Sequence, residues 1–246
     1  MKSKLQQTLE KNSKVITAEL MPPRGGDPIR SLKIAQLLKN KVHAVNITDG
    51  SRAIMRMCSL AMSKLLLDNG IEPIMQISCR DRNKIALQSD ILGANALGIK
   101  NILCITGDSV KAGDQQETKA VHEFEAVRLL KQIQSFNQGI DPTFDQLPDK
   151  RTDIFSGAAV DPSCQNQRIL KSRTIKKKGA GANFLQTQIV MDRKCLADFC
   201  NEISNPLEIP VIAGVFLLKS YKNALFINKF VPCLLYTSPS PRDNGR

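Results

Sequence analysis

Short apolar segments of strand length recur along the chain. They begin at Val15, Ala44, Ile74, Ile102, Ile154, Phe184 and Val211. Consecutive starts are separated by 29, 30, 28, 52, 30 and 27 residues, and stretches with helical periodicity, such as 52–69 and 83–97, lie between them. A strand–helix repeat of about 30 residues predicts βαβ units, whose strands are parallel and covered by helices.

Seven such units predict an α/β fold, the (β/α)8 TIM barrel, with the eighth strand and helix missing. A doubly wound open sheet is the competing architecture, but the even spacing and the lack of a GxGxxG motif after the first strand argue against it. We expect one barrel domain over 1–232. The eighth strand should begin near Ser238, where the sequence TSPSPRDNGR carries two prolines and cannot form a central strand. We therefore expect 233–246 to be a non-native or disordered tail that follows a C-terminal truncation.

The 52-residue interval marks an insertion after the fourth strand, over 107–150. It contains a predicted helix over 118–137 and a turn-rich segment after it. Loops that follow the carboxyl ends of barrel strands build the site in this architecture. We expect the insertion to hold a ligand rather than to decorate the surface.

Composition narrows the class of protein. Lys and Arg number 35 against 23 Asp and Glu, and 42% of residues are hydrophobic, which is enough for a globular core. No run is long and apolar enough to span a membrane, and the N-terminus lacks the apolar stretch of a signal peptide, so a cytoplasmic protein is expected. The seven cysteines form no CxxC pair and are interpreted as reduced thiols, mostly buried. Trp is absent and Tyr numbers 2, so base stacking on nucleic acid is poorly supported.

Polar residues at strand ends are candidates for chemistry. Glu19 ends an otherwise apolar strand; burial would raise its pKa and make it a general acid, whereas a solvent-facing or Arg24-paired carboxylate is equally consistent. The tripeptides 48–50 and 106–108 follow the second and fourth strands and read either as ordinary turns or as ligand contacts. Gln188 is either a satisfied core amide or a ligand contact.

Two further features have simpler explanations. Six basic residues lie within 168–178. Such a run is most often a solvated helix face; binding of a phosphate or a polyglutamate is the second explanation, and nonspecific attraction to nucleic acid is the third. His43 and His122 are isolated from other potential ligands, so no metal site is predicted.

The combination of motifs resembles the flavin-dependent methylenetetrahydrofolate reductases. In family order, the matching segments are AELMPPR (18–24), VNITDGS (45–51), SCRDRN (78–83), ITGD (105–108), GAAVDP (157–162), KKGAGANFLQTQIVMD (177–192) and IPVIAGVFLLKSYKNALFINKFVP (209–232). They run from the first strand to the seventh helix, a span of about nine tenths of the chain. The set is specific, although ITGD alone is weak.

This resemblance implies a reaction and its residues. The family reduces 5,10-methylenetetrahydrofolate to 5-methyltetrahydrofolate, with hydride passing from NADH or NADPH to bound FAD and then to the folate. Glu19 matches the family acid that protonates the folate nitrogen, and Asp108 matches the aspartate near flavin and pterin that stabilises the cationic iminium. Gln188 matches a folate-contacting glutamine, and Tyr221 falls where an aromatic ring can stack on folate or nicotinamide.

The resemblance also implies the flavin contacts. They carry over to Thr48, Ile105, Thr106, Gly107, Asp108, Ala158 and Lys177. A flavin-facing histidine of many members is Gln76 here, which can hydrogen-bond but carries no charge. Val160 replaces a tyrosine found in some members, and Lys177 supplies a cation suited to the FAD pyrophosphate.

The expected protein is therefore a cytoplasmic flavoprotein oxidoreductase of one-carbon metabolism that supplies methyl groups for methionine biosynthesis. Family members are commonly homo-oligomers, so a homo-oligomer without membrane or nucleic-acid partners is expected. The alternative is a non-catalytic folate- or flavin-binding partner subunit of the same fold. The motif residues Glu19, Asp108 and Gln188 favour the enzyme. The hypothesis of a nucleic-acid-binding protein is supported by the net charge alone.

Overall fold

The computed structural model describes residues 2–141, 143, 146–147, 151–222 and 225. The chain forms two compact units. Unit 1 contains the residues up to 158 together with 180–182, and unit 2 contains 159–179 and the residues from 183 onward. The expectation of a single barrel domain over 1–232, followed by a tail, stays a prediction.

All seven predicted strands are present, and they follow chain order in the sheet. Their bounds are β1 Thr17–Leu20, β2 Ala44–Ile47, β3 Pro73–Ser78, β4 Asn101–Ile105, β5 Phe155–Val160, β6 Phe184–Ile189 and β7 Val211–Gly214. Within unit 1 each strand from β1 to β5 pairs in parallel with the next, and within unit 2 β6 pairs in parallel with β7. The predicted parallel α/β barrel class is confirmed. The expected place of an eighth strand lies outside the described residues.

The helices alternate with these strands. Their bounds are α1 Lys4–Glu10, α2 Ile29–Leu38, α3 Ser59–Asp68, α4 Lys84–Ala96, α5 Ala126–Gln138, α6 Gln167–Gly179 and α7 Arg193–Phe199. Three shorter helical segments are η1 Ser51–Ala53, η2 Val110–Ala112 and η3 Cys200–Ser204. The helix expected over 83–97 is confirmed as α4, whose N-cap Asn83 accepts a hydrogen bond from the Ala86 N–H at 2.9 Å.

Two predicted helices begin later than their periodicity indicates. The 52–69 segment turns helical only at Ser59, because Arg52 and Ala53 have positive φ angles (58° and 55°) that interrupt a right-handed helix. The 118–137 segment turns helical at Ala126, because residues before it bond elsewhere: the Val121 N–H donates to the Arg80 carbonyl at 2.8 Å. In both cases the loop backbone has tertiary partners in place of helical ones.

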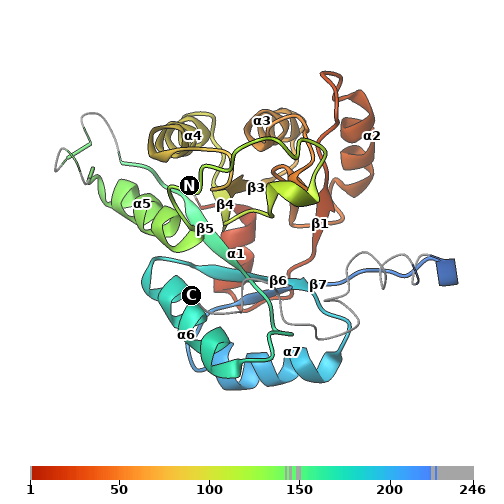
Figure 1. Ribbon diagram of the computed structural model, residues 1–246, viewed down its shortest axis with the longest axis vertical. Coiled ribbons are helices and arrows are strands. Elements are labelled where there is room, and N and C mark those ends of the chain that lie inside the picture. Colours follow the sequence, from red (N-terminus) through yellow and green to blue (C-terminus); the bar gives the residue numbers. More distant parts are fainter. Residues whose placement is uncertain (1, 142, 144–145, 148–150, 223–224, 226–246) are drawn as a thin grey trace. The chain divides into compact units, whose positions relative to one another are not determined.

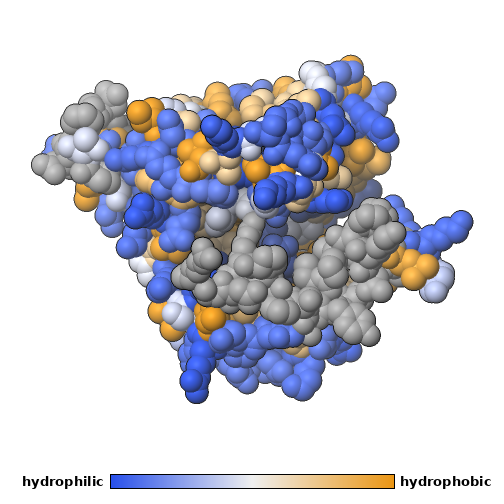
Figure 2. Space-filling model, in the orientation of Figure 1, coloured by the Kyte–Doolittle hydropathy of each residue, from blue (hydrophilic) through white to orange (hydrophobic). Residues whose placement is uncertain are grey.

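The sheet of unit 1 has one apolar face. Alternate strand residues such as Val45, Ile47 and Met75 are at most 1% exposed. Leu20, Val45 and Ile47 form a core cluster with Ala35, Met62, Leu66 and Ile71 of the helical side. Helices α2, α3 and α4 lie side by side against this face (Figure 1). Figure 2 shows mainly hydrophilic side chains on the solvent side of these helices, with apolar groups scattered between them.

Helix α1 lies at the amino ends of the strands in unit 1. Its Leu5 and Leu9 are buried, and Glu72, just before β3, accepts hydrogen bonds from the backbone N–H groups of Lys4 and Leu5 at 2.7 and 2.8 Å. The Ser3 hydroxyl donates to the side-chain oxygen of Asn101 in β4 at 2.6 Å. These bonds attach α1 to the strands and leave the carboxyl ends of the strands to other residues.

Unit 2 places α6 and α7 beside the β6–β7 pair (Figure 1). The Thr187 hydroxyl accepts the Gly214 N–H at 2.8 Å, which connects the two strands beyond their regular register. On α6, five of the six basic residues over 168–178 are exposed and one is half-buried. A solvated helix face therefore accounts for most of this basic run.

The cysteine prediction was wrong in one respect. No disulfide joins the six cysteines in the described part of the chain, but only Cys79 and Cys104 are fully buried. Burial raises the pKa of the Cys79 thiol to about 12, so it stays protonated at neutral pH. Over the described residues, no helix is long and apolar enough to cross a membrane.

Candidate functional site

A row of polar side chains lies on the second face of the unit 1 sheet. Glu19 of β1 is in register with Asn46 of β2, so both point to the same side. The Gln76 side chain of β3 donates from Nε2 to Asn46 Oδ1 at 3.3 Å, which places its side chain on that face as well. Asn46 and Gln76 are 3% and 7% exposed. Buried polar groups in the middle of strands point to a ligand-binding or catalytic face.

Glu19 has the chemistry expected of a proton donor. Its carboxyl makes no hydrogen bond or ion pair with any residue that the structure describes, including Arg24. Glu19 is exposed to solvent, yet the protein atoms packed around its carboxyl remove part of its hydration. This partial burial raises the pKa of Glu19 above that of an ordinary glutamate, so more of it stays protonated near neutrality.

The Thr48 hydroxyl directly follows β2 and is 2% exposed. Its Oγ1 atom has no hydrogen-bond partner among the described residues. An unpaired buried hydroxyl costs free energy of about 1–3 kcal/mol, which a bound polar ligand would recover. The hydroxyl thus fits a hydrogen bond to a ligand group.

The loop after β4 approaches the β3 loop closely at Gly107. This residue has φ +96°, and a Cβ atom there would lie 2.3 Å from Ser78 Oγ and 2.8 Å from Arg80 Cβ. Only glycine tolerates both the backbone conformation and the contact. Asp108, the next residue, is exposed and accepts the Arg52 N–H on Oδ2 at 2.7 Å. Its Oδ1 atom has no partner in the described part of the chain, so it is available to a ligand.

Arg80 joins three loops at the carboxyl ends of the strands. It is 4% exposed and binds the Asp81 carboxylate through Nε and Nη2, both at 2.6 Å. It also donates to the Gly50 carbonyl from Nη1 and Nη2 at 3.2 Å, and to the Asp108 carbonyl from Nη1 at 3.4 Å. The guanidinium therefore holds the loops after β2, β3 and β4 together.

A second arginine supports the first. Arg82 Nη1 binds Asp49 Oδ2 at 2.7 Å, and Arg82 Nε lies 2.7 Å from Asp90 Oδ2 of α4. The same Asp49 oxygen accepts the Ser78 N–H at 2.8 Å. Burial alone would lower the pKa of Arg82, but the charge of Asp49, its hydrogen bond and the charge of Asp90 raise it above its usual value.

The loop after β1 is tied to the same cluster. Arg24 forms an ion pair with Asp114, and the second oxygen of Asp114 accepts the Met55 N–H at 3.1 Å. Arg56 Nη1 donates to the Pro22 carbonyl at 2.9 Å. The loops that follow β1 to β4 thus form one connected layer above the polar face.

The remaining predicted contacts of unit 1 lie at two different places. Ile105 and Thr106 are half-buried and precede Gly107 at the strand end, where their backbone is close to the loop layer. Ala158 is 0% exposed and pairs with Cys104, whose side chain is on the helix-covered face. Any ligand contact at Ala158 would therefore use its backbone.

Unit 2 holds the other three predicted residues. Lys177 of α6 is half-buried, and its Nζ donates to the Ala159 carbonyl at 2.7 Å. Gln188 of β6 is exposed, so it is not a buried core amide, and its contact with a ligand stays a prediction. The Tyr221 side chain is 78% exposed.

Sequence reasoning missed Asn46 and the roles of Asp49, Arg80 and Arg82. Asn46 could have been found, because it is a polar residue within an apolar strand, as Glu19 is. The arginine contacts join loops that are distant in sequence, and no local signal marks them. In the residues described, no group of three or more His, Cys, Asp and Glu side chains could hold a metal ion.

A family model matches almost the whole chain. The model of one family, "Methylenetetrahydrofolate reductase", matches residues 4–236. The chain belongs to this family. The family match includes both the polar face of unit 1 and the predicted residues of unit 2.

Two curated relatives carry the family name. Methylenetetrahydrofolate reductase 2 of Schizosaccharomyces pombe is 25% identical in an alignment 248 positions long that covers 92% of this chain and 36% of the relative. A probable methylenetetrahydrofolate reductase (NADPH) of Caenorhabditis elegans is 22% identical in an alignment 245 positions long that covers 92% of this chain and 34% of the relative. The chain therefore spans about a third of the length of these relatives.

Solved structures of other proteins share the fold. A 2,3-dimethylmalate lyase of the PEP mutase/isocitrate lyase superfamily superposes with a TM-score of 0.58 at 15% identity, over 92% of this chain and 79% of that one. Deoxyribose phosphate aldolase from Aeropyrum pernix superposes with a TM-score of 0.50 at 13% identity, over 94% and 89%. At these identities the similarity shows the α/β fold alone.

Proposed function

We propose that the chain reduces 5,10-methylenetetrahydrofolate to 5-methyltetrahydrofolate, with bound FAD and with NADH or NADPH as the hydride source. Family membership and the names of the two relatives support the reaction. The observation that carries the proposal is Glu19, a carboxyl of raised pKa without a partner among the described residues, beside Asn46 and Gln76 on the polar face.

The residues of unit 1 fit a flavin. Thr48 offers a buried hydroxyl without a partner in the described chain, and Gly107 lets backbone approach a flat ligand because it has no side chain. Gln76 is a buried amide on the same face. The contact of Lys177 with the pyrophosphate is proposed from the family resemblance alone. When bound, FAD supplies two-electron hydride chemistry between the nicotinamide and the one-carbon unit.

Glu19 is the proposed acid. Reduction of the folate requires that a C–N bond of its five-membered ring opens, and the nitrogen must then receive a proton. A raised pKa keeps more of the carboxyl protonated than in an ordinary glutamate, and this acid form delivers the proton to the ring nitrogen, becoming a carboxylate. The partial exposure of Glu19 gives the resulting carboxylate a path for reprotonation from solvent.

Asp108 is proposed to orient the pterin. Its Oδ2 atom is fixed by the Arg52 N–H, and its backbone carbonyl by Arg80. The available Oδ1 atom can accept a hydrogen bond from a pterin N–H, and its negative charge favours a cationic iminium form of the substrate. Gln188 and Tyr221 of unit 2 are proposed folate and nicotinamide contacts.

The Glu19→Gln variant tests the proposal. The purified chain should show flavin absorbance that bleaches when NADH or NADPH is added without oxygen, and the variant should keep this half-reaction. Folate reduction should fall by a factor of about 10²–10⁴, because glutamine cannot donate the proton. Glu117→Gln, an exposed site without a partner among the described residues, is the matched control and should leave both half-reactions unchanged.

The pH profile gives a second readout. In the unmodified chain the folate half-reaction should be constant at low pH and fall as pH rises through the raised pKa of Glu19, because the acid form is lost. Glu19→Gln should abolish that limb. Loss of both half-reactions in the variant would contradict the acid role, and flavin binding without turnover in the unmodified chain would favour the partner-subunit alternative.

A further inference from the structure

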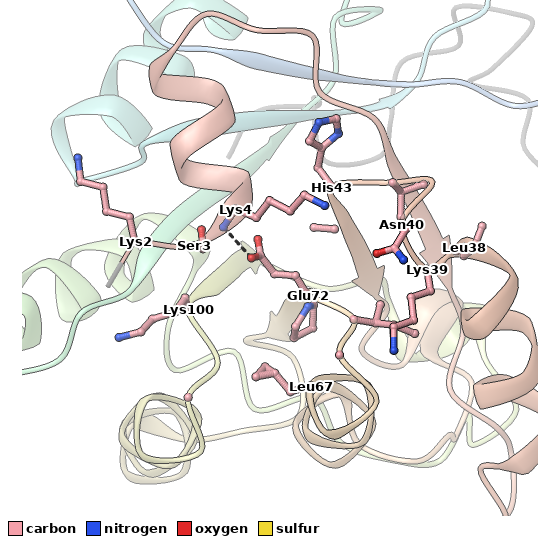
Figure 3. Close-up of a pocket in the computed structure, with 16 residues that line it drawn as sticks. Lys2, Ser3, Lys4, Leu38, Lys39, Asn40, His43, Leu67, Glu72 and Lys100 are labelled. Carbon is pink, nitrogen blue, oxygen red and sulfur yellow. Dashed lines mark hydrogen bonds between the residues drawn. The ribbon is translucent and has the colours of Figure 1, made fainter.

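A cavity of about 350 Å³ lies in unit 1 at the amino ends of the strands, opposite the end that carries the polar loops. It is bordered by the starts of β2 and β3 and by the ends of helices α2 and α3 (Figure 3). Its volume is at the lower end of the range found for small-molecule sites. None of the residues in the candidate site lines it.

The lining combines an apolar floor with a basic mouth. Ala44 and Ile71 are 1% and 5% exposed, and Val42, Leu38, Leu67 and Pro73 add further apolar surface. Four lysines, Lys2, Lys4, Lys39 and Lys100, also line the cavity, against one acidic residue, Glu72. The lining side chains therefore carry an excess of three positive charges.

The acidic residue does not neutralise this excess locally. Both oxygens of Glu72 are engaged by neutral donors: the Lys4 and Leu5 N–H groups and the Asn101 side-chain amide, at 2.7, 2.8 and 3.0 Å. Its charge is thus used to attach α1 to the strands. The Lys4 ammonium itself has no hydrogen-bond or ion-pair partner in the part of the chain that the structure describes.

A helix-end carbonyl and two carboxylates engage three of the four lysines, but not Lys4. Helices α2 and α3 end at the cavity, and their terminal carbonyls carry partial negative charge. Lys39 Nζ donates to the Asn69 carbonyl at 2.8 Å. Lys2 and Lys100 pair with acidic residues outside the lining, Glu10 at 2.7 Å and Asp153 at 3.0 Å. The Lys4 side chain instead extends across the cavity toward His43 (Figure 3). Lys4 is an exposed cation beside the apolar floor, without a counter-ion among the described residues.

His43 adds an imidazole ring to the lining. Its Nδ1 atom lies 3.1 Å from the Ile16 backbone nitrogen and 3.3 Å from the Ile16 carbonyl oxygen. An ammonium, an imidazole ring and an apolar floor together match a small molecule that has an anionic head and a compact apolar body. A phosphate monoester is mostly a dianion at neutral pH, so the lysines at the mouth attract it more strongly than they attract a carboxylate.

We propose that this cavity binds a small organic phosphate, whose phosphate group contacts Lys4 and whose apolar body covers the floor. Binding there would stabilise unit 1, because the ligand would contact α1, β2 and β3 together and would bind only the folded chain. The proposal concerns a site separate from the polar face, so it does not depend on the reductase activity.

Phenyl phosphate is the probe, measured by isothermal titration calorimetry on the full chain at low salt. We expect a dissociation constant of about 1 mM or tighter, which weakens as salt screens the lysines. Phenol and inorganic phosphate, each half of the probe, should bind at least about tenfold more weakly. Lys4→Ala should weaken binding at least about fivefold and Lys4→Arg by less than about twofold, because arginine keeps the charge.

Lys33→Ala is the matched control, since Lys33 is an exposed lysine of α2 outside the cavity. It should change the dissociation constant by less than about twofold. Equal effects of Lys4→Ala and Lys33→Ala would overturn the proposal, as would the absence of binding heat up to about 10 mM probe. Displacement of the probe by 5-methyltetrahydrofolate would also overturn it, because that would place the probe at the other end of the strands.

Discussion

Replacing Arg80 with leucine should destabilise the chain by about 2–3 kcal/mol. The substitution keeps a long side chain in a site where Arg80 is 4% exposed, but removes the five hydrogen bonds that it donates. Hydrogen bonds that involve a charged group contribute about 1.5–3 kcal/mol. The ion pair adds about 1 kcal/mol or less, because the Asp81 side chain is 42% exposed and can rehydrate.

Two features limit the loss. The Gly50 carbonyl keeps a second donor, the Ala53 N–H at 2.8 Å, and the bond to the Asp108 carbonyl is long at 3.4 Å. Leucine also buries apolar surface that partly compensates. Arg80→Lys should give an intermediate loss, because an ammonium keeps the charge but cannot form the two parallel bonds to Asp81.

The assay is urea unfolding followed by circular dichroism. With a slope of about 2–3 kcal/mol/M, the midpoint of Arg80→Leu should fall by about 1 M. The control is Arg128→Leu in α5, an exposed arginine without a partner among the described residues, which should shift the free energy of unfolding by less than about 0.5 kcal/mol. Equal midpoints for the two variants would refute the reasoning that Arg80 holds the loops together.

Three other changes have defined outcomes. Gly107→Ala should cost about 2–4 kcal/mol of unfolding free energy in urea, because of its φ of +96° and the 2.3 Å approach to Ser78, whereas Gly98→Ala, with φ +85° and open space, should cost about 1 kcal/mol. Thr48→Val should leave the melting temperature without ligand unchanged or higher, because it removes an unpaired buried hydroxyl, yet should weaken FAD binding measured by flavin fluorescence; a lower melting temperature would contradict this. Asn83→Ala should lower the unfolding free energy by about 1 kcal/mol through loss of the α4 cap, and Asn83→Asp should restore it.

The strands could be predicted from sequence because they are buried on their helix-covered face and spaced by whole helices. Apolar runs such as 102–105 are fully or mostly buried, so hydrophobicity alone marks them. Helix starts could not be predicted as well. The 52–58 segment has helical periodicity, but the Arg52 and Met55 N–H groups bond to Asp108 and Asp114, which lie more than 50 residues further along the chain. The hydrophobic periodicity of a segment does not indicate hydrogen-bond partners that are so distant in sequence.

A residue of the candidate site could be predicted where a polar side chain occurs within an apolar stretch of sequence. Glu19 stands out as an acid in an apolar strand, and its raised pKa follows from the same contrast. Arg80 offers no such contrast, since an arginine after a strand is an ordinary surface residue by sequence. Its burial depends on the loops that come to it from either side. The proposed roles of Gln188 and Tyr221 come from the family resemblance, and they stay predictions.

The contacts of Arg80 and Asp49 also bear on how this chain can change during evolution. In many α/β barrels each loop above the strands can be lengthened or exchanged separately, which lets one fold acquire new substrates. Here one guanidinium binds the loops after β2, β3 and β4, and one carboxylate joins the β2 loop to the β3 strand end. An insertion in any of these loops would displace a partner of the other two. The three loops should therefore accept substitutions in a correlated way and behave as a single inherited unit.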